Sequence, residues 1–77
     1  MKRGRAFWEN ALRERIGLLE RHRHVGSAER QMAARAREAL AQSVDLAALK
    51  AINRILKLTL QAADLEAARK RGRSSVR

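Results

Sequence analysis

The strongest pattern in this chain lies in residues 46–68, LAALKAINRILKLTLQAADLEAA. Apolar residues recur there every three or four positions, a spacing that predicts an α-helix and not a β-strand. The polar positions fall in one narrow strip: Lys50, Arg54, Lys57, Gln61 and Asp64. The apolar side covers more than half of the helix circumference, wider than the roughly 100° stripe of an ordinary surface helix. We therefore expect this helix to be the central one and to be covered on two sides, by other parts of the chain or by a second copy.

The packing residues are expected on this helix and on the segment that opens the chain. In residues 46–68 the main packing positions are Leu49, Ile52, Leu56 and Leu60, with Ile55 and Leu58 on the second apolar side. Residues 6–23 form another predicted helix, whose inward face includes Trp8 and Leu12. Arg15 interrupts that face, so we expect its stem to be buried and its guanidinium group to reach water.

A third helix is predicted for residues 28–42, with an inward face made mostly of small side chains. This face consists of Ala28, Met32, Ala36 and Ala39, with Leu40 at its edge. Gly26 should end the preceding helix in a left-handed conformation, and Ser27 should act as the N-cap of the next. Residues 43–45 interrupt the pattern, and Ser43 or Asp45 can cap the helix that follows. A continuous helix through this point remains possible because no proline forbids it.

These elements predict an all-α fold, a small bundle of two to three antiparallel helices with basic terminal tails. With 77 residues the chain is one domain, near the lower size limit for a self-sufficient core. The expected organisation is a basic arm in residues 1–5, a helical domain in residues 6–68 and a basic tail in residues 69–77. Within the domain the helices should span residues 6–23, 28–42 and 45–68. Because the alanine-rich face cannot cover the wide apolar arc, we expect self-association or docking onto a larger protein partner.

The net charge of +10 belongs mainly to the two ends of the chain. Residues 1–5 and 69–77 hold eight of the eighteen basic residues and no acidic ones, and arginine, whose planar group binds phosphate bidentately, predominates. This pattern predicts that the protein grips the phosphate backbone of DNA or RNA, largely without sequence preference. The candidate contact residues are those of the two ends and the basic line on the 46–68 helix: Lys2, Arg3, Arg5, Lys50, Arg54, Lys57, Arg69, Lys70, Arg71, Arg73 and Arg77.

Other functions remain open for the same residues. The arginines could meet an acidic protein surface, as in an adaptor or inhibitor of the kind encoded by phages and mobile elements, or could serve solubility alone. Residues 39–52 also have the spacing of a helix-turn-helix, although the turn has Ser43 where glycine is usual and Gln42 where an apolar residue is expected. Residues 45–66, with Asp-Leu-Ala-Ala-Leu and a leucine and isoleucine spacing, resemble helical segments of phage small terminase subunits. Many helical hairpins share this pattern, which assigns the chain to no family.

Catalysis, cofactors and membranes have little support in the sequence. The chain has no cysteine, no tyrosine and no glycine-rich phosphate loop, so we expect a protein that is not an enzyme and needs no cofactor. His22 and His24 are the only pair suggestive of a metal site, and a helix would point them about 200° apart, so we expect no bound metal. No apolar run is long enough to span a membrane, and no signal-peptide pattern follows the N-terminus. We expect an intracellular, cytoplasmic protein.

Overall fold

The computed structural model describes the backbone of residues 3–75 and the side chains of residues 3–70. Three helices and no strands occupy this part of the chain: α1 (Arg5–Arg21), α2 (Ser27–Ala41) and α3 (Leu46–Ser75). The helices pack against one another, and the molecule measures 49 × 30 × 15 Å along its principal axes. The predicted all-α fold is therefore confirmed. No helix in the described residues is both long enough and apolar enough to cross a membrane.

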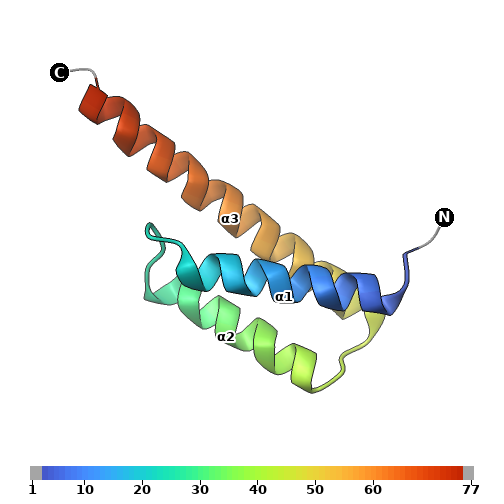
Figure 1. Ribbon diagram of the computed structural model, residues 1–77. Coiled ribbons are helices and arrows are strands. Elements are labelled where there is room, and N and C mark those ends of the chain that lie inside the picture. The colour runs from blue at the N-terminus through green and yellow to red at the C-terminus, as the bar shows by residue number, and fades with distance from the viewer. Residues whose placement is uncertain (1–2, 76–77) are drawn as a thin grey trace.

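The middle position in this bundle belongs to α1. It makes extensive contacts with both α2 and α3, whereas α2 and α3 contact each other less. Figure 1 shows α2 along one side of α1, and α3 crossing α1 and extending beyond the other two helices. The expectation that residues 46–68 form the central helix is thus wrong. The wide apolar arc of α3 is only partly covered, because α1 lies against one side of it and α2 reaches little of the rest.

The core is formed by one stripe from each helix, joined by Val25 from the first turn. Its fully buried members are Leu12, Ile16, Leu19, Ala33, Ala36, Leu49 and Leu56, with Ala63 almost as deep. On α2 the buried face is rotated from the predicted one, because Ala33 is buried and Ala28 is exposed. The small side chains of α2 allow it to lie close to α1 while burying little apolar area.

The helix α3 continues to Ser75, beyond the expected end at residue 68. The residues that follow Ala68 are mainly arginine and lysine, which favour helix nearly as well as leucine does. Gly72 lies within this extension, and one interior glycine costs only about 1 kcal/mol relative to alanine. The basic segment 69–75 is therefore a helical extension that projects past α1 and α2 (Figure 1).

The helices α2 and α3 are not continuous, because a turn separates them. In this turn Ser43 adopts a left-handed conformation with φ 56°. The N–H group of Ser43 donates to the Leu40 carbonyl oxygen at 3.3 Å, and that of Val44 donates to the Ala39 carbonyl oxygen at 3.5 Å. This pair of bonds is the Schellman motif that commonly ends helices. The Asp45 carboxylate then accepts from the Ala48 N–H at 2.9 Å and caps α3.

Replacing Ser43 by glycine is expected to stabilise the protein by about 0.5–1 kcal/mol, because glycine adopts this left-handed conformation without the clash that a Cβ introduces. The expected gain in melting temperature is about 2–8 °C. The matched control is Ser27→Gly at the first residue of α2, where the backbone is helical and no gain is expected. Thermal unfolding followed by circular dichroism measures both, and equal behaviour of the two variants would contradict the assignment.

The turn between α1 and α2 differs from its prediction. Gly26 has φ −97°, which is not left-handed, and Ser27 lies inside α2 and is not its N-cap. Gly26 is the N-cap, and its N–H group donates to Glu29 Oε1 at 2.8 Å. Glu29 at the third position of α2 therefore supplies the carboxylate half of a capping box, and its charge lies near the positive end of the helix dipole.

Candidate nucleic-acid interface

A groove of about 570 Å³ runs between the N-terminal half of α1 and the first half of α3. Basic side chains from the N-terminal segment and from both helices line it: Arg3, Arg15, Lys50, Arg54 and Lys57. Phe7 and Trp8 lie at the end of the groove nearest the start of α1. Other lining residues are Asn53, Leu58 and Gln61. We refer to this feature as the α1–α3 groove.

Helical periodicity places these residues along the groove. On α3, Lys50, Arg54 and Lys57 follow one another at intervals of four and three residues, so they lie on one flank. On α1, Trp8, Ala11 and Arg15 share the same kind of spacing and form the facing wall. The basic line that the sequence showed on one helix is therefore joined by cations from elsewhere in the chain.

The positive charge of the groove is not balanced by carboxylates. No aspartate or glutamate is among its lining residues. In the part of the chain with described side chains, the ion pairs are Arg5 with Glu9, Arg37 with Glu20, and Arg69 with Glu66, and Asp64 forms a hydrogen bond with His22. None of these pairs includes a groove cation. A concave surface lined by one sign of charge concentrates the electric field and attracts anions.

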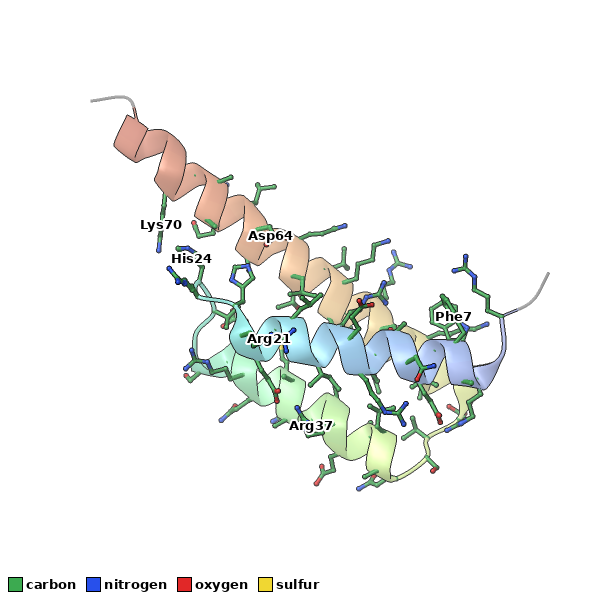
Figure 2. All side chains as sticks on the ribbon, viewed as in Figure 1. Phe7, Arg21, His24, Arg37, Asp64 and Lys70 are labelled. Atoms are coloured by element: carbon green, nitrogen blue, oxygen red, sulfur yellow. The ribbon has the colours of Figure 1, made fainter. Side chains whose placement is uncertain are left out.

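Two aromatic rings form the N-terminal end of the groove. The Phe7 and Trp8 rings meet edge to face, with centroids 5.2 Å apart. The Arg3 guanidinium carbon lies 4.5 Å from the centroid of Phe7, and Lys50 Nζ lies 5.7 Å from that of Trp8. Phe7 is 41% exposed, and Figure 2 shows it beside the first turn of α1. An exposed aromatic ring flanked by cations is a surface on which a flat ligand can stack.

Trp8 differs from Phe7 because it is partly buried and packs against the core. Its indole Nε1 is buried without a hydrogen-bond partner in the structure. Buried indole N–H groups usually find an acceptor, so this donor at the groove wall is an unusual feature. Trp8 is also the single tryptophan of the chain, which makes its fluorescence a specific reporter of the groove.

Asn53 connects the groove to the core. It is 1% exposed and lies between Leu49 and Leu56 on the buried stripe of α3. Its Oδ1 accepts from Arg15 Nη1 at 2.7 Å, while its Nδ2 donates to the carbonyl oxygens of Trp8 at 3.1 Å and Leu49 at 3.0 Å. Arg15 does not simply extend into water as expected, because Asn53 holds its guanidinium group against the groove wall.

Arg5 was predicted to contact phosphate, but the fold uses its guanidinium group internally. Arg5 Nε donates to Glu9 Oε2 at 2.9 Å, and Nη2 donates to the Val44 carbonyl oxygen. This side chain ties the beginning of α1 to the turn between α2 and α3. Of the two predicted N-terminal cations that the structure describes, Arg3 is therefore the one that lies in the groove.

The C-terminal cations with described side chains, Arg69 and Lys70, lie far from the groove. Arg69 and Lys70 are exposed on the extension of α3, where Arg69 lies 3.9 Å from Glu66. Figure 1 shows the start of α1 and the end of α3 at opposite ends of the molecule. Lys2 and Arg77 lie outside the described residues, as do the side chains of Arg71 and Arg73.

The predicted packing residues fall into three levels of exposure. Leu12, Leu49 and Leu56 are fully buried, and Trp8, Ile52 and Leu60 are partly buried against the core. Ile55 and Leu58 are about half exposed, as is Leu65. Leu58 also lines the α1–α3 groove, and Ile55 lines a second hollow together with Met32 and Ala36 of α2. The second apolar side of α3 therefore exists as a surface that the other described parts of the chain cover only in part.

The two histidines lie at the end of α1, away from the groove. His22 Nδ1 accepts from the His24 backbone N–H at 3.1 Å, so in the neutral ring Nε2 carries the hydrogen and donates to Asp64 Oδ1 at 2.9 Å. Figure 2 shows His24 and Asp64 on the side of the molecule where α1 ends. The described residues contain no group of three or more side chains placed to hold a metal ion.

Sequence reasoning missed Phe7, Asn53 and the contribution of Arg15 to the groove. For Asn53 a signal was present, since it continues the spacing of Leu49, Leu56 and Leu60 on one stripe. For Phe7 the only signal was its position between the basic arm and Trp8. Comparisons with protein-family models, with curated proteins and with solved structures give no match for this chain.

Proposed function

We propose that this protein is a small, non-enzymatic, nucleic-acid-associated protein that holds phosphate groups in the α1–α3 groove. The observation that carries the proposal is the set of five groove cations with no carboxylate among the lining residues. Each phosphate bound by lysine or arginine releases counterions, which supplies affinity without reading sequence. Arg3 represents the N-terminal arm in this groove, and the basic extension of α3 offers a second contact at the other end.

The remaining expectations belong to the same proposal. Consecutive helices would pack antiparallel, basic segments would flank them, and the protein would act in the cytoplasm. Phosphate contacts would serve DNA and RNA alike, because they carry no information about base identity.

The test is the salt dependence of binding to a labelled duplex and a labelled single strand between about 50 and 300 mM salt. The triple variant Lys50→Gln, Arg54→Gln, Lys57→Gln removes three phosphate contacts. The negative slope of log K against log salt should therefore become shallower by about 2–3. We expect an affinity loss of about tenfold or more at the lowest salt. Binding that is absent at the lowest salt would overturn the proposal.

A matched variant controls for net charge. Arg23, Arg30 and Arg35 are exposed and lie outside the α1–α3 groove, so replacing all three by glutamine removes the same charge elsewhere. This control should keep most of the affinity and most of the salt slope. If both triple variants lose affinity equally, binding depends on total charge and the groove is not the site.

The alternative is a protein-binding adaptor or inhibitor, and the half-exposed Ile55, Leu58 and Leu65 favour it. An apolar strip beside a basic groove is suited to a larger protein with an acidic rim. Poly-glutamate in place of nucleic acid distinguishes the two functions. Binding to poly-glutamate without binding to either oligonucleotide would favour the adaptor.

A further inference from the structure

We propose that the α1–α3 groove selects single-stranded nucleic acid, with one base stacked on Phe7 and neighbouring phosphates on Lys50, Arg54 and Lys57. This inference rests on the proposed function and adds the class of ligand. It follows from the aromatic end of the groove, from the exposed apolar side chains of α3 and from the placement of the cations.

The first step concerns the ring of Phe7. It is 41% exposed at the groove, and the guanidinium group of Arg3 covers part of it at 4.5 Å. Arg3 precedes α1, which begins at Arg5, so its side chain can move without disturbing the helix. A base can stack on Phe7 and place its other face against the Arg3 guanidinium group. Stacking on aromatic rings and on arginine is how proteins hold unpaired bases.

The second step excludes α3 as a helix that reads a duplex. A helix in the major groove presents polar side chains at its tip, since these contact the base edges. The exposed part of α3 instead carries apolar side chains, Ile55 and Leu65, together with Leu58, which also lines the groove. Its cations lie on the flank that faces α1, inside a concave groove. In a duplex the bases are stacked inside, so Phe7 could not reach one without unpairing it.

The third step is the alignment of the cations with the ring. Lys50, Arg54 and Lys57 extend over about 10 Å along α3. Lys50 Nζ also lies 5.7 Å from the ring of Trp8, the neighbour of Phe7. The stacking surface and the phosphate contacts therefore form one continuous path. A strand lying along it would have its base at Phe7 and its backbone on α3.

The experiment compares a single strand with a duplex of equal length at about 50 mM salt, using Trp8 fluorescence and a labelled oligonucleotide. Phe7→Leu keeps an apolar side chain and removes the aromatic ring. It should weaken single-strand binding about 5- to 150-fold and leave duplex binding within about twofold. Phe7→Tyr, which retains an aromatic ring and adds no second tryptophan, should restore single-strand binding. Circular dichroism confirms that both variants keep the helical fold.

The outcomes separate this inference from the proposed function. If Phe7→Leu changes neither affinity, or lowers both equally, stacking on Phe7 is wrong. In that case a loss of binding in the Lys50, Arg54 and Lys57 variant would still support phosphate gripping. If the wild-type protein binds neither oligonucleotide, both proposals fail. A single strand with abasic residues provides a further check, since removing its bases should reproduce the effect of Phe7→Leu.

Discussion

Replacing Leu56 by alanine is expected to lower the free energy of unfolding by about 2–5 kcal/mol. Leu56 is 1% exposed and belongs to the core between the three helices. Its truncation removes apolar contacts and leaves a cavity that neighbouring side chains can fill only in part. For a domain of this size the loss is a large share of a total stability of about 4–12 kcal/mol.

The measurement is urea unfolding followed by circular dichroism, together with the melting temperature. At about 4–8 °C per kcal/mol, the variant should melt at least about 8 °C below the wild type. The matched control is Leu65→Ala on the same helix, where the side chain is 61% exposed and the expected change is within about 0.5 kcal/mol. If Leu56→Ala unfolds like the wild type, this stripe of α3 does not form the core.

The control also tests self-association. If the exposed strip of α3 pairs with a second copy, Leu65→Ala will lose stability in a manner that depends on protein concentration. A concentration-independent result near zero would mean that Leu65 takes no part in such pairing. The comparison therefore separates packing within one chain from packing between chains.

Much of this fold could be predicted because the periodicity of apolar residues can be recognised without knowing which helices pack against each other. The spacing of Leu12, Leu49 and Leu56 predicted both helix and burial, and all three are in the core. Residues 43–45 marked an interruption of the pattern, but the sequence left a continuous helix open, and the structure shows the break. The end of α3 was wrong because the apolar pattern stops at residue 68, whereas helix formation depends also on the propensities of arginine and lysine.

The rotation of α3 was harder to predict. The apolar arc of α3 is so wide that several rotations of the helix would bury it equally well. The sequence pattern favoured a rotation that buries Ile52, whereas the structure buries Asn53. The facing helix α1 decides between these rotations, because Arg15 on α1 supplies a hydrogen-bond partner for Asn53. The groove depends on the same tertiary information. Arg3, Arg15 and the Lys50 line are far apart in sequence and meet because α1 lies against α3.

Replacing Asn53 by leucine is expected to destabilise the protein by about 1–3 kcal/mol, although leucine is apolar and similar in size. The reason is Arg15, whose guanidinium group would lose the acceptor that it now has at 2.7 Å. The carbonyl oxygens of Trp8 and Leu49 would lose a donor as well. A buried polar group left without a partner costs more than the hydrogen bond itself contributes.

A double-mutant cycle with Arg15 tests this explanation. Arg15→Leu alone should also destabilise, because it leaves the buried Oδ1 of Asn53 without a donor. The double variant Arg15→Leu, Asn53→Leu should be more stable than the sum of the two losses predicts, by about 0.5–3 kcal/mol. Unfolding free energies from urea titration give this coupling. Strict additivity would mean that the contact contributes nothing to stability.

The cycle bears on function because Asn53 is the polar link that fixes α1 along α3. A single polar side chain in an apolar seam can set the register of two helices, since sliding either helix breaks its hydrogen bonds. Here the bonds run from Asn53 to Arg15 and to the Trp8 carbonyl oxygen, two residues that lie about two turns apart on α1. The groove is formed by these same two helices, so its cations and rings keep their spacing only in this register. The double variant should therefore refold with much of its stability and still bind single strands more weakly than the loss of Arg15 alone explains. Equal binding by Arg15→Leu and the double variant would show that Asn53 stabilises the fold without shaping the groove.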